Sequence, residues 1–188
     1  MSSQRFNIVL ATAALAIAVA GPSFAGDPAP YAARAGVSLA DDAAHAWAPD
    51  AALVYVENDE HLSSDGQAVR WGYLYYSASL DATRGYSIRD DEIVVAEDLG
   101  LTFEAPPLSP GWIDSGRALA AAEEQVGRKL REKGTDVSLA TMLLIRGAFL
   151  SGKPDMTTWL VVYEAPDAPS TFVVVDAHSG DVRRTWRG

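Results

Sequence analysis

The sequence contains no cysteine in its 188 residues. This absence excludes disulfide bonds, a thiolate nucleophile and every metal site that depends on cysteine sulfur. A chain of this length can bury roughly 70% of the surface that it exposes when unfolded, so it does not need cross-links to be stable. We therefore expect a fold that packing and hydrogen bonds hold together.

The sequence also lacks the motifs of the commoner catalytic and nucleotide-binding sites. It has no G-x-S-x-G elbow, no H-E-x-x-H helix and neither of the glycine-rich phosphate-binding motifs. Its three histidines, His45, His61 and His178, are scattered, and His178 falls in an expected turn. We predict that the protein is not an enzyme and that it has no catalytic residue, no cofactor and no metal site.

Some arrangements of acidic residues nevertheless leave chemistry open. Asp41 and His45 are four residues apart and can share one face of a helix, but two ligands are weak evidence for a metal ion. The loop that begins at Glu57 is rich in oxygen ligands but lacks the spacing of a calcium loop. Paired carboxylates of the glycosidase kind depend on contacts that a sequence does not show. The carboxylates of such an uncharacterised hydrolase would be Asp59, Glu60 and Asp65.

Positive charge is scarce. The chain has 15 lysine and arginine residues against 25 aspartate and glutamate residues, which gives a net charge of −10. A polyanion repels the phosphate backbone of nucleic acids and the anionic headgroups of lipids. We therefore exclude nucleic acid and membrane surfaces as main partners, and the acidity itself is accounted for by solubility.

Long apolar runs are missing except at the N-terminus. Residues 8–20 are apolar except for Thr12 and follow Arg5, which is the only charged residue before Asp27. This run is shorter than the roughly 20 residues that a membrane-spanning helix needs. Small residues at Ser23 and Ala25 complete the pattern of a secretory signal peptide. We predict that residues 1–25 are removed by cleavage after Ala25, and that the protein is periplasmic or secreted without a membrane anchor.

The rest of the chain divides into two similar halves. After a flexible arm (26–37), a short helix capped by Ser38 precedes about four strands (38–99). A proline-rich linker (100–113) leads to a longer helix capped by Asp114 or Ser115, and to four more strands (114–188). Helices that precede antiparallel strands indicate an α+β fold. We predict two αββββ units, related by an internal repeat, in which one helix covers each antiparallel sheet.

Rows of aromatic residues are the most informative feature of these strands. Alternate positions of a strand share a face, and two predicted strands place bulky rings on one face in this way. These rings either form an ordinary core beneath the helix or make an exposed surface for a peptide or an apolar ligand. The candidate binding residues are Trp71, Tyr73, Tyr75, Trp159 and Tyr163.

The second half of the chain resembles the PepSY domain family. The likeness rests on the charged, alanine-rich helix and on residues 159–184, WLVVYEAPDAPSTFVVVDAHSGDVRR, whose hairpin is similar to the family's IDA-x-TG-x-V pattern. Residues 46–76 look like the divergent PepSY-like units that precede such domains. The resemblance implies a cystatin-like fold and a non-catalytic module that inhibits or chaperones peptidases, with no catalytic residues to transfer.

Three functional hypotheses follow. The leading one is an exported, non-catalytic protein that binds another polypeptide, such as a secreted or periplasmic peptidase. The second is a carrier of a small apolar ligand, in which the sheet curls around a cavity that the aromatic rows line. The third is the carboxylate-dependent hydrolase.

Overall fold

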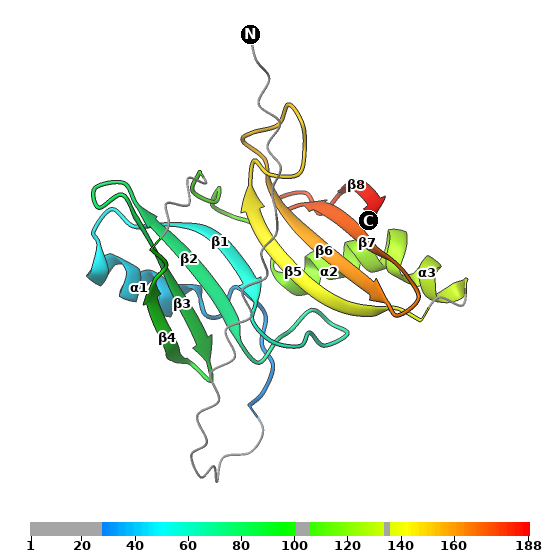
Figure 1. Cartoon of the computed structure of the whole chain (residues 1–188), viewed down its shortest axis with the longest axis horizontal. Coiled ribbons are helices and arrows are strands. Elements are labelled where there is room, and N and C mark those ends of the chain that lie inside the picture. The colour runs from blue at the N-terminus through cyan, green and yellow to red at the C-terminus, as the bar shows by residue number, and fades with distance from the viewer. Residues whose placement is uncertain (1–27, 101–105, 134–135) are drawn as a thin grey trace.

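The computed structural model describes residues 28–100, 106–133 and 136–188 (Figure 1). The predicted signal peptide and its cleavage site lie outside these residues. The elements, in chain order, are α1 (Val37–Trp47), β1 (Ala52–Asn58), β2 (Trp71–Ser77), β3 (Ala82–Arg89), β4 (Glu92–Asp98), α2 (Ser115–Ala122), η1 (Glu123–Gly127), α3 (Arg128–Glu132), β5 (Ser138–Arg146), β6 (Thr157–Ala165), β7 (Ala168–Asp176) and β8 (Val182–Arg187).

All eight strands form one antiparallel sheet in the order β4-β3-β2-β1-β5-β6-β7-β8. The α+β class predicted from the sequence is therefore confirmed. The prediction of two separate αββββ units, each with its own sheet and helix, is wrong. β1 and β5 pair with each other through Tyr55 and Ile145, Val56 and Leu144, and Glu57 and Leu143. This pairing satisfies backbone groups that two separate sheets would each leave open at an edge.

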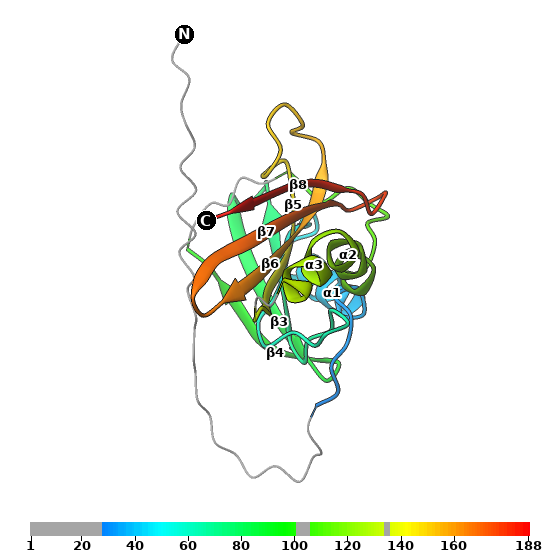
Figure 2. The same cartoon turned by 90° about the vertical axis from the view of Figure 1, so that its right-hand side faces the viewer.

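Both helical segments lie on the same side of the sheet (Figure 2). α1 contacts β2, β3 and β4, whereas α2 contacts β6 and β7. The side chains between the helices and this face of the sheet belong to one continuous core, to which both halves of the chain contribute. A smaller apolar cluster lies on the opposite face and is built around Leu160 and Val174.

The second helical segment is continuous but changes its hydrogen-bond pattern midway. Asp114 caps α2, since its side chain accepts a hydrogen bond from the Ser115 amide, as the sequence predicts. Five residues of π-helix (η1) then separate α2 from α3. The Glu123 carboxylate lies against Gly127 and pairs with Arg131. α1 differs from the prediction, because it begins at Val37 and has no side-chain cap, so Ser38 lies inside the helix.

The described parts of the predicted arm and linker pack against the sheet and helices. Tyr31 forms an isolated β-bridge with Ala68, which precedes β2 in the chain. The Tyr31 hydroxyl donates a hydrogen bond to the Ile88 carbonyl at 2.6 Å. In the linker, the Leu108 amide donates to the Leu53 carbonyl at 2.8 Å, and Trp112 is buried. These contacts therefore fix the segments that lead into α1 and α2.

Candidate functional site

The five aromatic residues predicted to bind a partner are core residues. Their exposed fractions are between 0% and 1%, for Trp71, Tyr73, Tyr75, Trp159 and Tyr163. The Tyr73 hydroxyl donates to the Ala33 carbonyl at 2.8 Å, and the Tyr75 hydroxyl donates to Asp41 on α1. Burial raises the pKa of both phenols far above its ordinary value. Of the alternatives that the sequence left open for these residues, their burial agrees with the ordinary core beneath the helices and not with an exposed surface or a ligand cavity.

The carboxylates considered for hydrolysis also form hydrogen bonds and ion pairs with other side chains of the protein. Asp59 accepts a hydrogen bond from Ser87, and Glu60 pairs with Arg89 at 2.7 Å. Asp65 lies apart from both, in a loop where it accepts from Ser63. Burial raises the pKa of Glu57, although the hydrogen bond from Tyr55 partly offsets this rise. Burial likewise raises the pKa of Asp59 against the opposite effect of the hydrogen bond from Ser87. The structure therefore brings Glu57, Asp59 and Glu60 close to one another but not Asp65.

The three histidines and the candidate metal ligands do not converge. The Asp41 carboxylate accepts from Tyr75, and the His45 ring lies 2.8 Å from the backbone oxygen of Asp41. His178 lies in the turn before β8, where its ring nitrogen is 3.0 Å from the Pro110 carbonyl. Within residues 28–100, 106–133 and 136–188, no three histidine or acidic side chains are grouped so that they could hold a metal ion.

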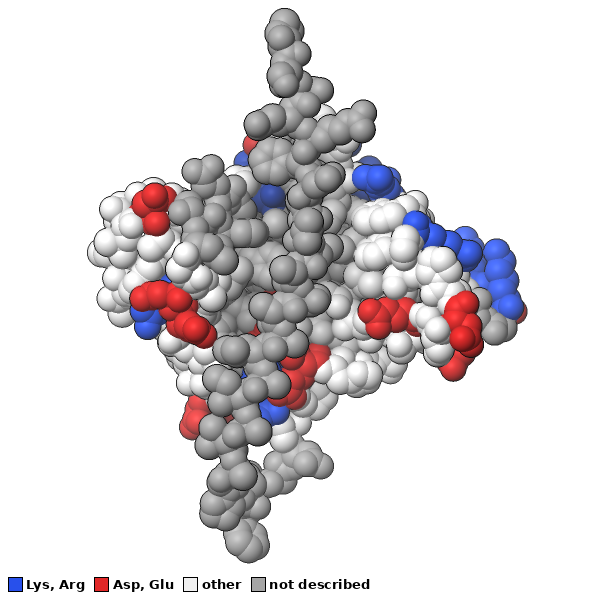
Figure 3. Space-filling model, in the orientation of Figure 1, with Lys and Arg blue, Asp and Glu red and all other residues white. Residues whose placement is uncertain are grey.

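The best candidate for a functional site is β8, a strand at one edge of the sheet. β8 pairs with β7 on one side only, and most of its residues are exposed. An edge strand presents backbone N–H and C=O groups that can pair with another extended chain. Three arginines on or beside this edge, Arg183, Arg184 and Arg187, contrast with the net negative charge of the chain. Figure 3 shows basic side chains at this end of the molecule, toward the upper right.

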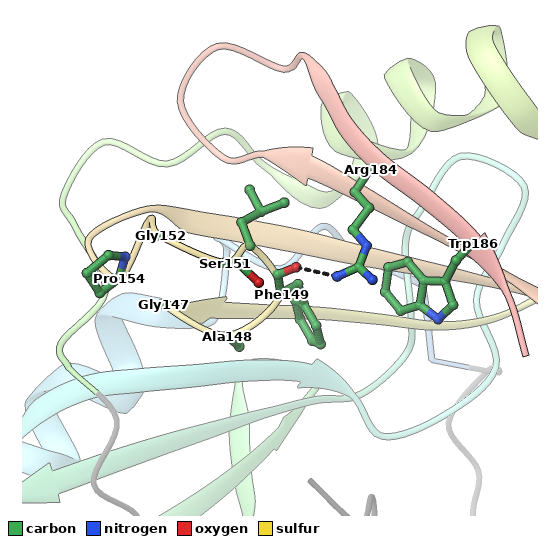
Figure 4. Close-up of a pocket in the computed structure, with 9 residues that line it drawn as sticks. Gly147, Ala148, Phe149, Ser151, Gly152, Pro154, Arg184 and Trp186 are labelled. Carbon is green, nitrogen blue, oxygen red and sulfur yellow. Dashed lines mark hydrogen bonds between the residues drawn. The ribbon is translucent and has the colours of Figure 1, made fainter. Parts of the chain in front are cut away.

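A hollow of about 330 Å³ lies beside β8 on the sheet face away from the helices (Figure 4). The loop between β5 and β6 forms one wall, and Arg184 and Trp186 form the other. The Arg184 guanidinium stacks over the Trp186 ring at 4.8 Å and donates to the Phe149 carbonyl at 3.0 Å. The Phe172 ring also stacks against Trp186, with 5.0 Å between the ring centres. These contacts hold an aromatic ring and a cation at fixed positions on the edge strand.

The wall formed by the loop depends on glycine. Gly147 has a φ of +77°, which side chains with a Cβ rarely adopt, and an added Cβ would lie 2.6 Å from the Pro154 carbonyl oxygen. Arg146, at the end of β5, also holds this loop, because its guanidinium donates a hydrogen bond to the Asp155 carboxylate at 3.0 Å. The loop therefore has a defined shape next to β8.

A second hollow, of about 310 Å³, lies on the helix side of the same edge. It is lined by Val126, Leu130 and the stems of two lysines from the helical segment, together with Thr185 and Trp186 of β8. Trp186 therefore contributes to both hollows, which lie on the two sides of one edge strand. Alternate residues of an added strand point to these two sides.

The sequence analysis did not single out this site. The signal was present in residues 182–187, VRRTWR, where three arginines and a tryptophan occur in a strand of an acidic protein. What the sequence could not show was that this strand lies at the edge of the sheet, with a hollow on each side.

Comparisons with known proteins add information about the fold. No family model matches the chain, and no curated protein matches its sequence. The structure is similar to the crystal structure of a "putative lipoprotein" from Clostridium difficile 630, with a TM-score of 0.56 and 12% sequence identity. The match covers 81% of this chain and 93% of the other. At this identity the similarity shows that the two proteins share a fold. No helix in the described ranges is long and apolar enough to cross a membrane.

Proposed function

We propose that the protein is an exported, non-catalytic, PepSY-like protein that binds another polypeptide along β8. The observation that carries this proposal is the position of Trp186, which lies on an open strand edge between two hollows. In binding by strand addition, the backbone of the edge supplies hydrogen bonds and the flanking pockets select alternate side chains. β8 has both features.

The charge of the edge favours an acidic partner segment. Arg184 and Arg187 are exposed on β8, while Arg183 already pairs with Asp176 at 2.8 Å and with Asp181 at 3.1 Å. A carboxylate opposite Arg184 would gain a charge-assisted hydrogen bond, and an apolar side chain two residues away would contact the Trp186 ring. The partner segment is therefore extended, with an acidic residue and an apolar residue two positions apart on the same face.

The packing of the core favours binding at the surface of the protein over binding of a ligand in its interior. Trp71, Tyr73 and Trp159 pack between helices and sheet, and the two hollows at β8 are at the low end of the roughly 300–1,000 Å³ of small-molecule pockets. Recognition therefore falls to edges and loops. The PepSY resemblance suggests a secreted or periplasmic peptidase as the partner, which the protein would inhibit or chaperone. Export is proposed from the N-terminal signal alone.

Site-specific photo-crosslinking tests the proposal in cells that produce the full chain. A photoreactive amino acid replaces Thr185, which is exposed on β8, and in a matched control it replaces Asp42, which is exposed on α1. We expect an adduct with an acidic, extended segment of another exported polypeptide at position 185 and none at position 42. The adduct should disappear when Arg184→Glu and Arg187→Glu are added.

The same strains link the adduct to function. If the partner is a peptidase, deletion of the protein should change the secreted peptidase activity, and the Arg184→Glu/Arg187→Glu variant should reproduce that change. Equal crosslinking at positions 185 and 42, or crosslinking that survives the arginine replacements in a folded variant, would contradict the proposal.

A further inference from the structure

We infer that the two edges of the sheet are complementary, and that β4 of a second copy pairs with β8 to continue the sheet. The inference deepens the proposed function, since it rests on the same edge strand being open to strand addition. When the partner polypeptide is missing, β4 of a second copy takes its place along β8. β4 and β8 lie at opposite ends of the sheet in Figure 1.

The direction of the strands permits this pairing. Every neighbouring pair in the sheet is antiparallel, so the first strand of the order, β4, runs opposite to the last, β8. A second copy that is moved along the sheet, without being turned over, presents its β4 antiparallel to β8 of the first. Its helices then lie on the same side of the extended sheet. The alternation of strand direction therefore continues across the contact.

The side chains match in a register that sets Glu97 opposite Arg184. Successive cross-strand pairs place Val95 and Glu97 of β4 on the sheet face away from the helices, where Arg184 and Trp186 also lie. In this register Val95 comes opposite Trp186, two residues from the ion pair. A carboxylate meets a guanidinium and an aliphatic side chain meets an indole ring on the same face.

The two edges also differ in charge as wholes. β4 contains Glu92, Glu97 and Asp98 and no basic residue, whereas β8 contains three arginines and no acidic residue. Val94 is 46% exposed on β4, an unusual position for a large apolar side chain on an otherwise charged edge. Like charges would oppose pairing of β4 with β4 or of β8 with β8, so the contact runs from head to tail. Such a contact does not close, and it extends as copies are added.

A charge-swap experiment on the purified protein tests the inference by sedimentation velocity. We expect the average sedimentation coefficient of the unchanged protein to rise with concentration at low salt and to return to the monomer value at high salt. Glu97→Lys alone should sediment as a monomer, because its β4 repels β8, and Arg184→Glu alone should do the same. An equimolar mixture of these two variants should associate, since each β4 then meets a β8 of opposite charge.

Control variants separate this inference from the proposed function. Glu164→Lys with Asp167→Lys changes exposed acidic residues in β6 and in the β6–β7 turn, neither of which belongs to an edge strand, and should still associate. The inference is overturned if the unchanged protein is a monomer at every concentration, or if the mixture fails to associate. The Glu97→Lys variant retains β8 and should still form the partner adduct at position 185. If the unchanged protein forms the adduct at position 185 but does not self-associate, only this inference fails. If it self-associates but forms no such adduct, only the proposed function fails.

Discussion

The indole rings of Trp71 and Trp159 meet edge to face, with 6.3 Å between their centres. Trp71 comes from β2 and Trp159 from β6, so the contact joins the two halves of the chain. Each indole N–H donates at 2.8 Å to a backbone carbonyl that precedes a helix, that of Tyr31 for Trp71 and that of Ile113 for Trp159. The two halves thus repeat one interaction and meet through it in a common core.

Removal of either ring should damage the whole fold. We predict that Trp71→Ala and Trp159→Ala each lower the free energy of unfolding by about 3–5 kcal/mol, as is usual for large buried aromatic residues. The phenylalanine variants should lose less, because they keep most of the packing but not the hydrogen bond to Tyr31 or Ile113. Urea unfolding curves measure these values. A loss below about 1 kcal/mol, closer to that of a surface substitution, would contradict the burial of the ring.

Continuity of the sheet predicts that the protein unfolds in one step. The pairing of β1 with β5 and the common core connect the halves, so neither half can lose its structure without exposing the core of the other. We expect calorimetry to give one transition whose calorimetric and van't Hoff enthalpies agree. Two resolved transitions would indicate separate units instead of one sheet.

Asp50 should make stability depend on acid pH. Its carboxylate accepts hydrogen bonds from Ser77 and from the amide and hydroxyl of Ser79, which lower its pKa from 3.8 to about 2. A lowered pKa in the folded state stabilises the protein above the unfolded pKa, and the stabilisation is lost as the pH falls toward 2. Asp50→Asn should therefore melt at a lower temperature than the unchanged protein at pH 7. Asp42→Asn, at an exposed position, is the control.

The difference in melting temperature between Asp50→Asn and the unchanged protein should shrink as the pH falls from about 4 to about 2, where the aspartate itself becomes protonated. A difference that stays constant over this interval would show that the hydrogen bonds do not depend on the charge of Asp50.

Glu57 should act in the opposite direction. Burial raises its pKa, and nearby Asp59 raises it further, so the ionised carboxylate costs stability at neutral pH and this cost vanishes in acid. Glu57→Gln keeps an oxygen that accepts the Tyr55 hydroxyl but removes the buried charge. We predict a higher melting temperature than that of the unchanged protein at pH 7, and equal values once the pH is below the unfolded pKa of glutamate. Glu164→Gln, at an exposed position, should change little at any pH.

Much of the secondary structure could be predicted from local pattern. Alternating aromatic and apolar residues predict β2 and β6, and the Asp114 cap predicts the start of α2. Coverage of β6 and β7 by the second helical segment is also confirmed. These elements follow from side-chain periodicity within a few residues of the chain.

The joining of the sheets could not be predicted in this way. Val56 and Leu144 are far apart in the sequence, and nothing in either strand specifies the other as its neighbour. The same limit applies to the candidate site. Trp186 becomes a candidate binding residue only because β8 lies at an edge, and the edge is defined by the order of all the other strands. The inward position of Trp71, in contrast, agrees with the core alternative that its alternation left open.

The most direct test of strand addition at β8 is amide hydrogen exchange of the full chain with and without an extended acidic peptide. The probe is a synthetic peptide in which glutamate and valine stand two residues apart, with a threonine between them, and its matched control carries lysine in place of each glutamate. We predict that the acidic peptide slows the exchange of backbone amides in Val182–Arg187, and that the basic peptide does not. Unchanged exchange in β8 at saturating acidic peptide, or protection that appears only in other strands, would contradict the proposal that β8 is the binding edge.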